Sequence, residues 1–352
     1  MPFFDMGPDC VQQAAMQHHD ERGEWRSGRK MGGVGVTEHP AYTLTVPGDL
    51  PIPVLIAAPH AGRAYSRSVL TRMRDAEYST IRLEDRYVDR IAEAVAKATG
   101  AALLIARCPR AVLDLNRSPH DVDWGMISGK DITSGKNGAT GPISSANRRA
   151  RSGLGLVPRR LPVIGEIWNA PLPMRELEGR IRDIHAPYHT ALSATLDRIG
   201  DRWGAALLID IHSMPPIRQP ARQATDQADR ARRQASSEQV LPVHYVIGDR
   251  FGASADDRLT AAALHMFAME GAAVAHNRPY AGGYILDRHG MPGRGRHGLQ
   301  LEVCRSLYLD RNCRETTPGL AGVVSVITKL TRLLGERVVR MGGRGEVVIA
   351  AE

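Results

Sequence analysis

The sequence predicts an α/β protein, in which strands buried on both faces alternate with helices. Short apolar runs such as 52–59, 101–106 and 205–211 are bounded by glycine, proline or charged residues. Runs of this length are typical of buried central strands, and segments with helical periodicity lie between them. The chain has 352 residues, 43% of them hydrophobic, which is enough for one large core or for a core domain with a smaller addition.

We expect a single domain over residues 41–340. Residues 1–40 are rich in glycine and weakly periodic, so they predict a flexible extension, and residues 341–352 predict a C-terminal tail. Residues 120–160 are rich in glycine, serine and asparagine and predict a loop-rich insertion near the functional site. Long loops of this kind are usually lids or mobile segments.

The elements of the domain follow in order. The predicted strands are 52–59, 101–106, 111–115, 205–214, 243–248, 272–275 and 297–305. The predicted helices are 83–96, which a glycine at position 100 stops, then 171–196, 259–270 and 320–334. The last helix is apolar-periodic and should pack on the sheet.

The charge pattern favours a small acidic substrate over nucleic acid. The net charge is +8, but most arginines are dispersed among acids, and only 147–151 and 218–233 concentrate them. Such runs are usually solvated loop or helix faces. The chain has four phenylalanines and no interleaving of aromatic and basic residues, so it offers no evident stacking platform for bases. An acidic small molecule explains the positive charge equally well.

The sequence also predicts a cytoplasmic protein without a membrane span. No apolar stretch approaches the roughly 18 residues that cross a bilayer, and the N-terminus lacks the order of a signal peptide. The four cysteines lie far apart and form no Cys-x-x-Cys pair. Neither a disulfide framework nor a thiolate zinc site is therefore indicated.

Two histidines stand at the ends of predicted strands. His212 and Asp210 lie near the end of the strand 205–214, on the same face because strand side chains alternate, so the carboxylate can orient the imidazole. His60 directly follows the strand 52–59. Strand ends are where α/β sheets place active sites, and two such histidines predict a metal site. The alternative for His212 is a histidine bonded to backbone.

Three further groups of residues are candidates for the site. Asp85 and Asp89 share one face of the predicted helix 83–96; alternatively, Asp85 favours the helix N-terminus and Asp89 pairs with an arginine. Asn116 and Arg117 follow the predicted strand 111–115, and such a pair can clamp a carboxylate, although a structural ion pair of Arg117 is also open.

Glu302 lies within the predicted strand 297–305, among apolar residues. Burying a carboxylate there costs free energy unless it is paired with a cation or takes part in catalysis. Glu302 is therefore a candidate general base. A salt bridge with Arg305 or another arginine is the alternative.

Taken together, these segments resemble the N-formylglutamate amidohydrolase family in order from about residue 50 to residue 310. The segments that carry the resemblance are Pro59-His60-Ala61-Gly62, Glu84-Asp85-x-x-Val88-Asp89, Pro109-Arg110-x-x-x-Asp114-x-Asn116-Arg117, Ile209-Asp210-x-His212-Ser213-Met214-Pro215, Gly248-Asp249-Arg250-Phe251-Gly252, Arg278-Pro279-Tyr280-Ala281-Gly282-Gly283-Tyr284 and His297-x-Leu299-Gln300-x-Glu302-x-x-Arg305-x-Leu307-Tyr308. The resemblance implies a three-layer α/β/α fold with a mixed central sheet, similar to zinc carboxypeptidases and aspartoacylases. It also implies one catalytic zinc ion.

The resemblance further implies roles for individual residues. His60 and His212 match the histidine ligands, but Arg63 stands where related zinc hydrolases have a glutamate, so the third ligand is expected to be Asp85, with Asp89 as the second choice. Glu302 matches the general base. The remaining implied residues are Asn116, Arg117 and Arg305 for substrate carboxylates, Tyr284 and His297 for the pocket lining, and Asp210 and Ser213 in support of the ligands.

The implied reaction is hydrolysis of N-formyl-L-glutamate to formate and L-glutamate. Two alternatives remain at this point. One is a hydrolase of another N-acyl amino acid or of a peptide on the same scaffold. The other is a binding protein for acidic ligands that lacks catalysis.

Overall fold

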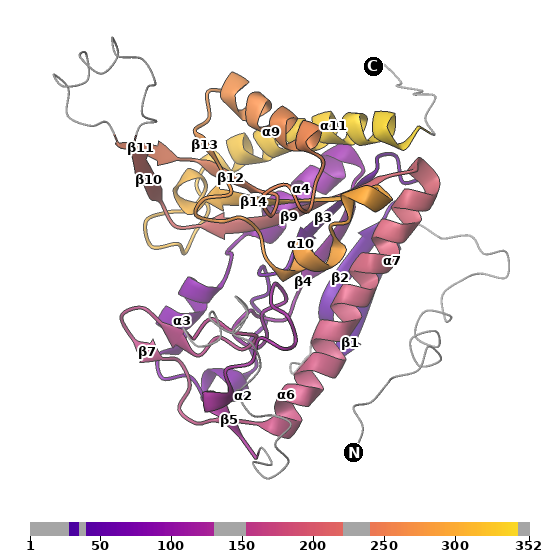
Figure 1. The fold of residues 1–352 in the computed structure, drawn as a ribbon. Coiled ribbons are helices and arrows are strands. Elements are labelled where there is room, and N and C mark those ends of the chain that lie inside the picture. The colour runs from indigo at the N-terminus through magenta and orange to yellow at the C-terminus, as the bar shows by residue number, and fades with distance from the viewer. Residues whose placement is uncertain (1–27, 35–39, 130–152, 221–239, 344–352) are drawn as a thin grey trace.

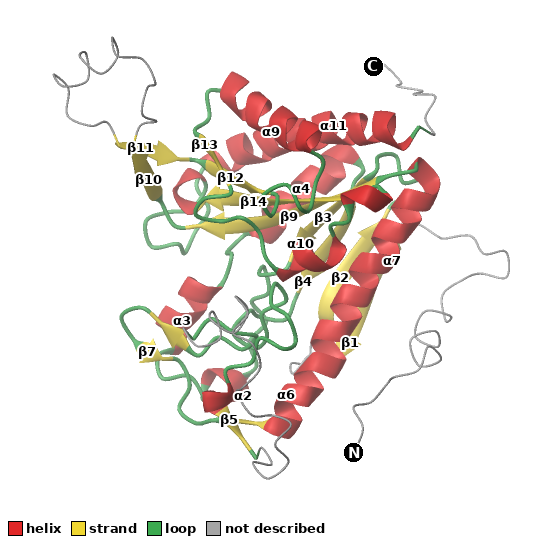
Figure 2. Cartoon of the chain, in the orientation of Figure 1, coloured by secondary structure: helices red, strands yellow, loops and turns green. Residues whose placement is uncertain are grey.

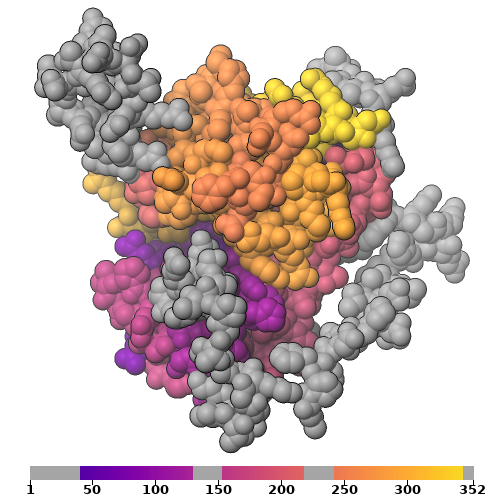
Figure 3. Space-filling view, viewed as in Figure 1, coloured from indigo at the N-terminus to yellow at the C-terminus, as the bar shows by residue number. Residues whose placement is uncertain are grey.

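The structure is a computed structural model that describes residues 28–34, 40–129, 153–220 and 240–343 (Figure 1). The basic run 147–151, most of the run 218–233 and much of the predicted insertion therefore lie outside the described residues. Figure 3 shows the later part of the chain, orange to yellow, above the earlier part, indigo to magenta.

The centre of the fold is an eight-stranded mixed sheet in the order β1-β2-β4-β3-β9-β14-β12-β13. Its strands are β1 (Gly28–Val34), β2 (Pro40–Val46), β3 (Val54–Ala58), β4 (Ala102–Ala106), β9 (Ala206–Met214), β12 (Tyr245–Gly248), β13 (Val274–His276) and β14 (Arg296–Cys304). The four central strands β4, β3, β9 and β14 are parallel to one another, and β2 and β12 flank them in antiparallel orientation. The predicted mixed sheet is confirmed.

Helices cover both faces of the sheet (Figure 2). The described helices are α2 (Arg67–Leu70), α3 (Ala76–Leu83), α4 (Val88–Thr99), α6 (Met174–Arg180), a π-helical turn (Ile181–His185), α7 (Ala186–Trp203), α9 (Asp257–Met269), α10 (Tyr284–His289) and α11 (Gly319–Gly342), of which α4, α9 and α11 cover one face of the sheet and α7 covers the other. Shorter pairs of strands are β5 (Ile127–Ser128) with β8 (Leu172–Pro173), β6 (Arg160–Leu161) with β7 (Gly165–Glu166), and β10 (Ile217–Pro220) with β11 (Val240–Val243).

Two hydrophobic cores fill the space between the sheet and its helices. Along β3, Val54 and Ile56 belong to the core under α4, α9 and α11, whereas Leu55 and Ala57 belong to the core under α7. This alternation follows from the two-residue period of a strand. All residues of β3 are buried, which explains why its sequence is continuously apolar. The predicted three-layer α/β/α architecture is confirmed.

The strand predicted over residues 111–115 is wrong. The backbone turns there instead, with the amides of Val112 and Leu113 donating to the carbonyl of Pro109, and that of Asp114 donating to Leu156. The apolar side chains of this segment are fully buried in the core under α7. The apolar run therefore reflects burial, which periodicity alone does not separate from a strand.

The start of the helix predicted over residues 83–96 is also wrong. Helix α3 ends at Leu83, and α4 begins at Val88 after Tyr87 adopts a left-handed conformation with φ of 59°. In the bend between the helices, the amide of Asp85 donates to the carbonyl of His60. Asp85 and Asp89 consequently do not share a helical face.

The predicted N-terminal extension contains a strand of the sheet, because β1 pairs with β2 in antiparallel register. Residues 1–27 and 35–39 lie outside the described part of the chain. Among the helices that the structure describes, none has the length and hydropathy needed to cross a bilayer.

The junction between α7 and β9 depends on a glycine, and this dependence can be tested. Gly204 has a φ of 79°, and a Cβ atom there would lie 2.2 Å from the carbonyl oxygen of Gly342. We expect Gly204→Ala to lower the free energy of unfolding by at least about 1–2 kcal/mol, measured by urea denaturation. Gly200→Ala is the matched control, because a Cβ atom there meets open space within α7. The control should raise the free energy of unfolding by about 0.5–1 kcal/mol. Equal effects of both variants would contradict this account of the junction.

Candidate metal centre and active site

The central parallel strands bring polar residues together at one end of the sheet. His60 follows the end of β3, and His212 lies near the end of β9. In the register of β9 with β14, His212 is paired with Glu302 and Asp210 is paired with Gln300. Paired residues of adjacent strands point to the same face, so the imidazole and the carboxylate lie side by side.

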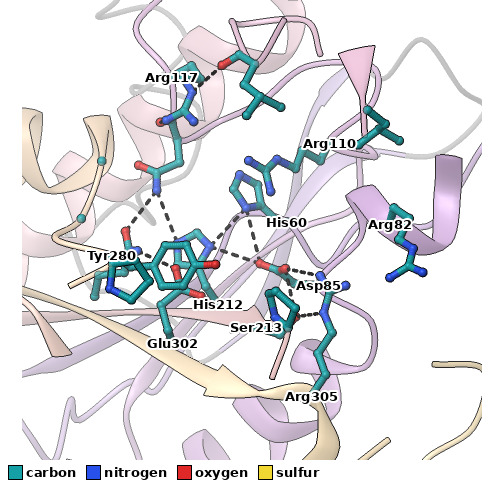
Figure 4. Close-up of a pocket in the computed structure, with 18 of the residues that line it drawn as sticks. His60, Arg82, Asp85, Arg110, Arg117, His212, Ser213, Tyr280, Glu302 and Arg305 are labelled. Carbon is teal, nitrogen blue, oxygen red and sulfur yellow. Dashed lines mark hydrogen bonds and ion pairs between the residues drawn. The ribbon is translucent and has the colours of Figure 1, made fainter. Parts of the chain in front are cut away.

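Three buried side chains, His60, Asp85 and His212, point toward one another and can hold a metal ion (Figure 4). His212 Nδ1 lies 3.1 Å from His60 Nδ1 and 3.2 Å from Asp85 Oδ2, and His60 Nδ1 lies 3.4 Å from Asp85 Oδ2. A tetrahedral zinc ion with bonds of about 2.0–2.1 Å separates neighbouring ligand atoms by about 3.3 Å. The three separations match this geometry without rearrangement, and the donor set suits zinc.

The outer nitrogen of each imidazole is bound to a carboxylate. His60 Nε2 lies 2.8 Å from Asp114 Oδ1, and His212 Nε2 lies 2.8 Å from Asp210 Oδ2. When each Nε2 carries the proton and donates it to its carboxylate, each Nδ1 keeps a lone pair directed into the cluster. Carboxylates in this position typically fix the orientation of metal-ligating histidines and make them more basic.

The third member of the cluster, Asp85, is also held in place. Its Oδ1 accepts hydrogen bonds from Ser213 Oγ at 3.0 Å and from Arg305 Nη2 at 3.3 Å, which leaves Oδ2 facing the imidazoles. Burial by itself raises the pKa of Asp85, but hydrogen bonds that His212 and His60 donate when their Nδ1 atoms are protonated outweigh it and hold the pKa well below its usual range. Asp89 lies elsewhere, because both of its oxygens accept hydrogen bonds from the Arg63 guanidinium, at 2.9 and 2.7 Å.

Glu302 lies beside this cluster and is 6% exposed. Burial raises the pKa of its carboxyl to about 7, against the lowering influence of the His212 ring. Its Oε1 accepts a hydrogen bond from Gln300 Nε2 at 2.8 Å. Arg305 donates instead to Ser213 and to the backbone carbonyl of Glu84. These contacts do not support the alternative of a salt bridge between Glu302 and Arg305.

A cavity of about 680 Å³ opens onto the cluster and onto Glu302. Its lining includes four arginines, which are Arg82, Arg110, Arg117 and Arg305. Arg110 Nε donates to Asp114 Oδ2 at 2.9 Å, which fixes this guanidinium next to the carboxylate that holds His60. Tyr280, labelled in Figure 4, lines the same cavity. The concentration of cations around a small cavity favours an anionic ligand.

Asn116 and Arg117 also line the cavity. Asn116 is buried, and its Nδ2 donates to Gln300 Oε1 at 3.2 Å while its Oδ1 accepts from the amide of Ile285 at 2.9 Å. Arg117 Nε donates to the carbonyl of Leu154 at 2.9 Å. The side-chain amide of Asn116 thus links the turn at 116–117 both to β14 and to the start of α10.

Two residues predicted to line the pocket do not line the cavity. Tyr284 packs against the rings of His185 and His189, and its hydroxyl accepts a hydrogen bond from Arg288. His297 lies at the start of β14, at the opposite end of the strand from Glu302, where its Nδ1 accepts from the amide of Asp256. Belonging to a family segment does not fix the direction of a side chain, which explains these differences.

Four residues of the site received no role from the sequence. They are Arg110, Asp114, Tyr280 and Gln300. A signal was present for Asp114, because it stands within the same short segment as Arg110 and Asn116. Its role as the partner of His60 depends on the turn at 109–117, which the predicted strand concealed.

Comparisons with known proteins identify the family of this chain. The family model for N-formylglutamate amidohydrolase matches residues 52–309. A relative named N-formylglutamate deformylase from Pseudomonas putida is 28% identical over 269 residues, which cover 76% of this chain and 84% of the relative. A second relative of the same name from Pseudomonas aeruginosa is 27% identical over 263 residues, which cover 74% and 83%.

One solved structure carries the same family name, and a second shares the fold. The crystal structure of an N-formylglutamate amidohydrolase from Ralstonia eutropha is 28% identical, with a TM-score of 0.70 over 86% of this chain and 99% of that one. A gene product of Agrobacterium tumefaciens is 17% identical and shares the fold, with a TM-score of 0.58 over 85% of this chain and 96% of that one. The family match covers every residue of the site, and this chain belongs to the N-formylglutamate amidohydrolase family.

Proposed function

We propose that this protein is a zinc-dependent amidohydrolase that converts N-formyl-L-glutamate and water to formate and L-glutamate. The observation that carries the proposal is the buried group of His60, Asp85 and His212, with Glu302 beside it in a cavity lined by arginines. The relatives named N-formylglutamate deformylase support this choice of substrate.

In this proposal, His60 Nδ1, His212 Nδ1 and Asp85 Oδ2 hold the zinc ion. Zinc in such a site polarises a carbonyl and lowers the pKa of water toward neutrality. Asp114 and Asp210 keep the two imidazoles in the tautomer that presents Nδ1. Ser213 and Arg305 donate hydrogen bonds to Asp85 Oδ1, and we propose that they orient this carboxylate toward the zinc ion.

Glu302 is assigned as the general base. It takes a proton from the attacking water and then delivers that proton to the amine nitrogen as the amide bond breaks. Burial raises the pKa of this carboxyl, which favours a group that both takes up and releases a proton. Gln300 fixes one carboxylate oxygen, so the other is available for the water.

We propose that cationic and amide side chains of the cavity bind the substrate. Arg117, with Asn116 at its base, is proposed to bind a carboxylate of the glutamate. Arg110 is fixed by Asp114 beside the cluster, and we assign it to the formyl oxygen, where negative charge grows during attack. We assign no substrate contact to Tyr284 or His297, because neither residue lines the cavity.

Removing the metal is predicted to abolish turnover. After dialysis against a chelator, the protein should lose activity on N-formyl-L-glutamate and regain it with about one equivalent of zinc per chain. His212→Ala should lose both bound zinc and activity, whereas His265→Ala, on the exposed side of α9, should lose neither. Elemental analysis and a formate assay measure the two properties. Full activity in metal-free protein would contradict zinc dependence.

Glu302→Gln is predicted to separate metal binding from catalysis. The variant keeps the volume of the side chain and the zinc ligands, but it cannot accept the proton of the water. We expect normal zinc content and a kcat lower on the order of a hundredfold to ten-thousandfold. A kcat like that of the unmodified protein would remove Glu302 from the role of base.

A panel of acyl groups is predicted to separate this function from its nearest rival. The zinc-loaded protein should prefer N-formyl-L-glutamate to N-acetyl-L-glutamate and N-succinyl-L-glutamate in kcat/KM, because formyl is the smallest acyl group. The rival is a deacylase of another N-acyl amino acid on the same scaffold. Activity confined to a longer acyl chain would favour that rival.

A further inference from the structure

We propose that His185, His189 and His289 are positioning residues, which hold the turn at Asn116–Arg117 in the shape that binds the substrate carboxylate. They do so through a closed ring of hydrogen bonds between this turn, the π-helical turn with α7, and α10. The inference rests on the proposed function for its effect on substrate, but the ring itself is defined by contacts outside the metal centre.

The first part of the ring consists of two contacts on either side of Asn116. His185 Nε2 lies 3.0 Å from the carbonyl oxygen of Arg117, and His189 Nε2 lies 3.0 Å from that of Leu115. A carbonyl oxygen only accepts, so both Nε2 atoms must carry a proton. The two donors therefore fix the backbone of the turn before and after the Asn116 side chain.

The sequence places these two histidines together. His185 ends the π-helical turn Ile181–His185, and His189 lies one turn later in α7, with the two ring centroids 4.3 Å apart. Residues spaced by four along a helix share a face. Single π-turns within helices occur frequently at functional sites, where they redirect a side chain. Here the π-turn ends at the histidine that contacts Arg117.

The second part of the ring links α7 to α10. His189 Nδ1 lies 2.9 Å from Nε2 of His289, and the two rings are stacked with an interplanar angle of 9°. Because the proton of a neutral His189 is already on Nε2, its Nδ1 must accept. His289 Nε2 must therefore donate, so the three neutral imidazoles have one consistent set of tautomers.

The third part of the ring returns from α10 to the turn. The amide of Ile285 donates to Asn116 Oδ1 at 2.9 Å, and that of Tyr284 donates to the Asn116 carbonyl at 3.4 Å. A Cβ atom at Gly283 would lie 2.6 Å from Asn116 Oδ1, so the start of α10 fits closely around this amide. The turn, α7 and α10 thus hold one another in place.

The environment of the histidines keeps them neutral. All three are at most 2% exposed. Burial lowers the pKa of His185 to about 4 and that of His289 to about 3, and it lowers the pKa of His189 well below its usual range. Only a neutral imidazole can donate at one nitrogen and accept at the other. This requirement explains why a histidine, and not an arginine or a lysine, stands at the centre of the ring.

The experiment compares a variant that keeps the donor with one that removes it. In His185→Gln the amide nitrogen can still donate to the carbonyl of Arg117, whereas His185→Leu leaves this carbonyl without its partner. We expect His185→Leu to raise KM for N-formyl-L-glutamate roughly 5- to 20-fold, with a much smaller change in kcat. His185→Gln should remain within about threefold of the unmodified protein in KM. Thr195→Val, a buried change farther along α7, is the control and should leave KM unchanged.

A second readout does not depend on activity. Amide hydrogen exchange of the segment 113–118 should be faster in His185→Leu than in the unmodified protein, and unchanged in His185→Gln and Thr195→Val. Unchanged exchange in His185→Leu, or equal damage in the Leu and Gln variants, would overturn the proposal. Failure of the unmodified protein to hydrolyse N-formyl-L-glutamate would count against the proposed function alone, because hydrogen exchange still tests the ring.

A third measurement needs no destabilising variant. In the unmodified protein labelled with ¹⁵N-histidine, the three imidazoles should be neutral with the proton on Nε2 at pH 7. Their signals can be assigned by their loss in the His185→Gln, His189→Gln and His289→Gln proteins. A charged form, or a proton on Nδ1, at His189 or His289 would overturn the ring even if His185→Leu fails to fold.

Discussion

The parallel pairing of β9 with its neighbours β3 and β14 is the constraint on which the site depends. The register sets His212 opposite Glu302 and Asp210 opposite Gln300, and β3 delivers His60 to the same end of the sheet. A shift of one residue would turn His212 to the other face of the sheet, under α4 and α11. The apolar side chains that fix this register are therefore as necessary to the site as its polar ones.

The charges of the site are balanced by their arrangement. Asp85, Asp114 and Asp210 are each at most 2% exposed, and isolated carboxylates at that depth would be strongly destabilising. Each meets a histidine or an arginine at hydrogen-bond distance, and the Nδ1 atoms of His60 and His212 still face one another at 3.1 Å. When the protons of both rings are on Nε2, the two Nδ1 atoms and the Asp85 oxygen form an electron-rich centre, which a divalent cation stabilises.

Much of the site could be predicted from the sequence, because its main residues lie on strongly patterned strands. His60, His212 and Glu302 each follow or interrupt an apolar run, and the structure places all three at one cavity. The position of Asp85 is harder to predict from the sequence, because Asp85 lies in a bend between α3 and α4, where the sequence has a continuous helical pattern. The turn at 109–117 resembled a strand because its apolar residues are buried, so the contact of Asp114 with His60 was missed. Side-chain direction at Tyr284 depends on tertiary packing and could not be read from sequence order. The two-residue period of the strand, in contrast, already puts His297 on the opposite face from Glu302.

We propose that His60, His212 and Asp85 bind one zinc ion through the atoms that face one another in this structure. A crystal structure of the zinc-loaded protein, with anomalous diffraction recorded on both sides of the zinc absorption edge, tests this claim most directly. We expect a single strong anomalous peak at about 2.0–2.2 Å from His60 Nδ1, His212 Nδ1 and Asp85 Oδ2. A peak bound instead through Nε2 of either histidine, a peak next to Asp89, or the lack of a peak in the cavity would contradict it.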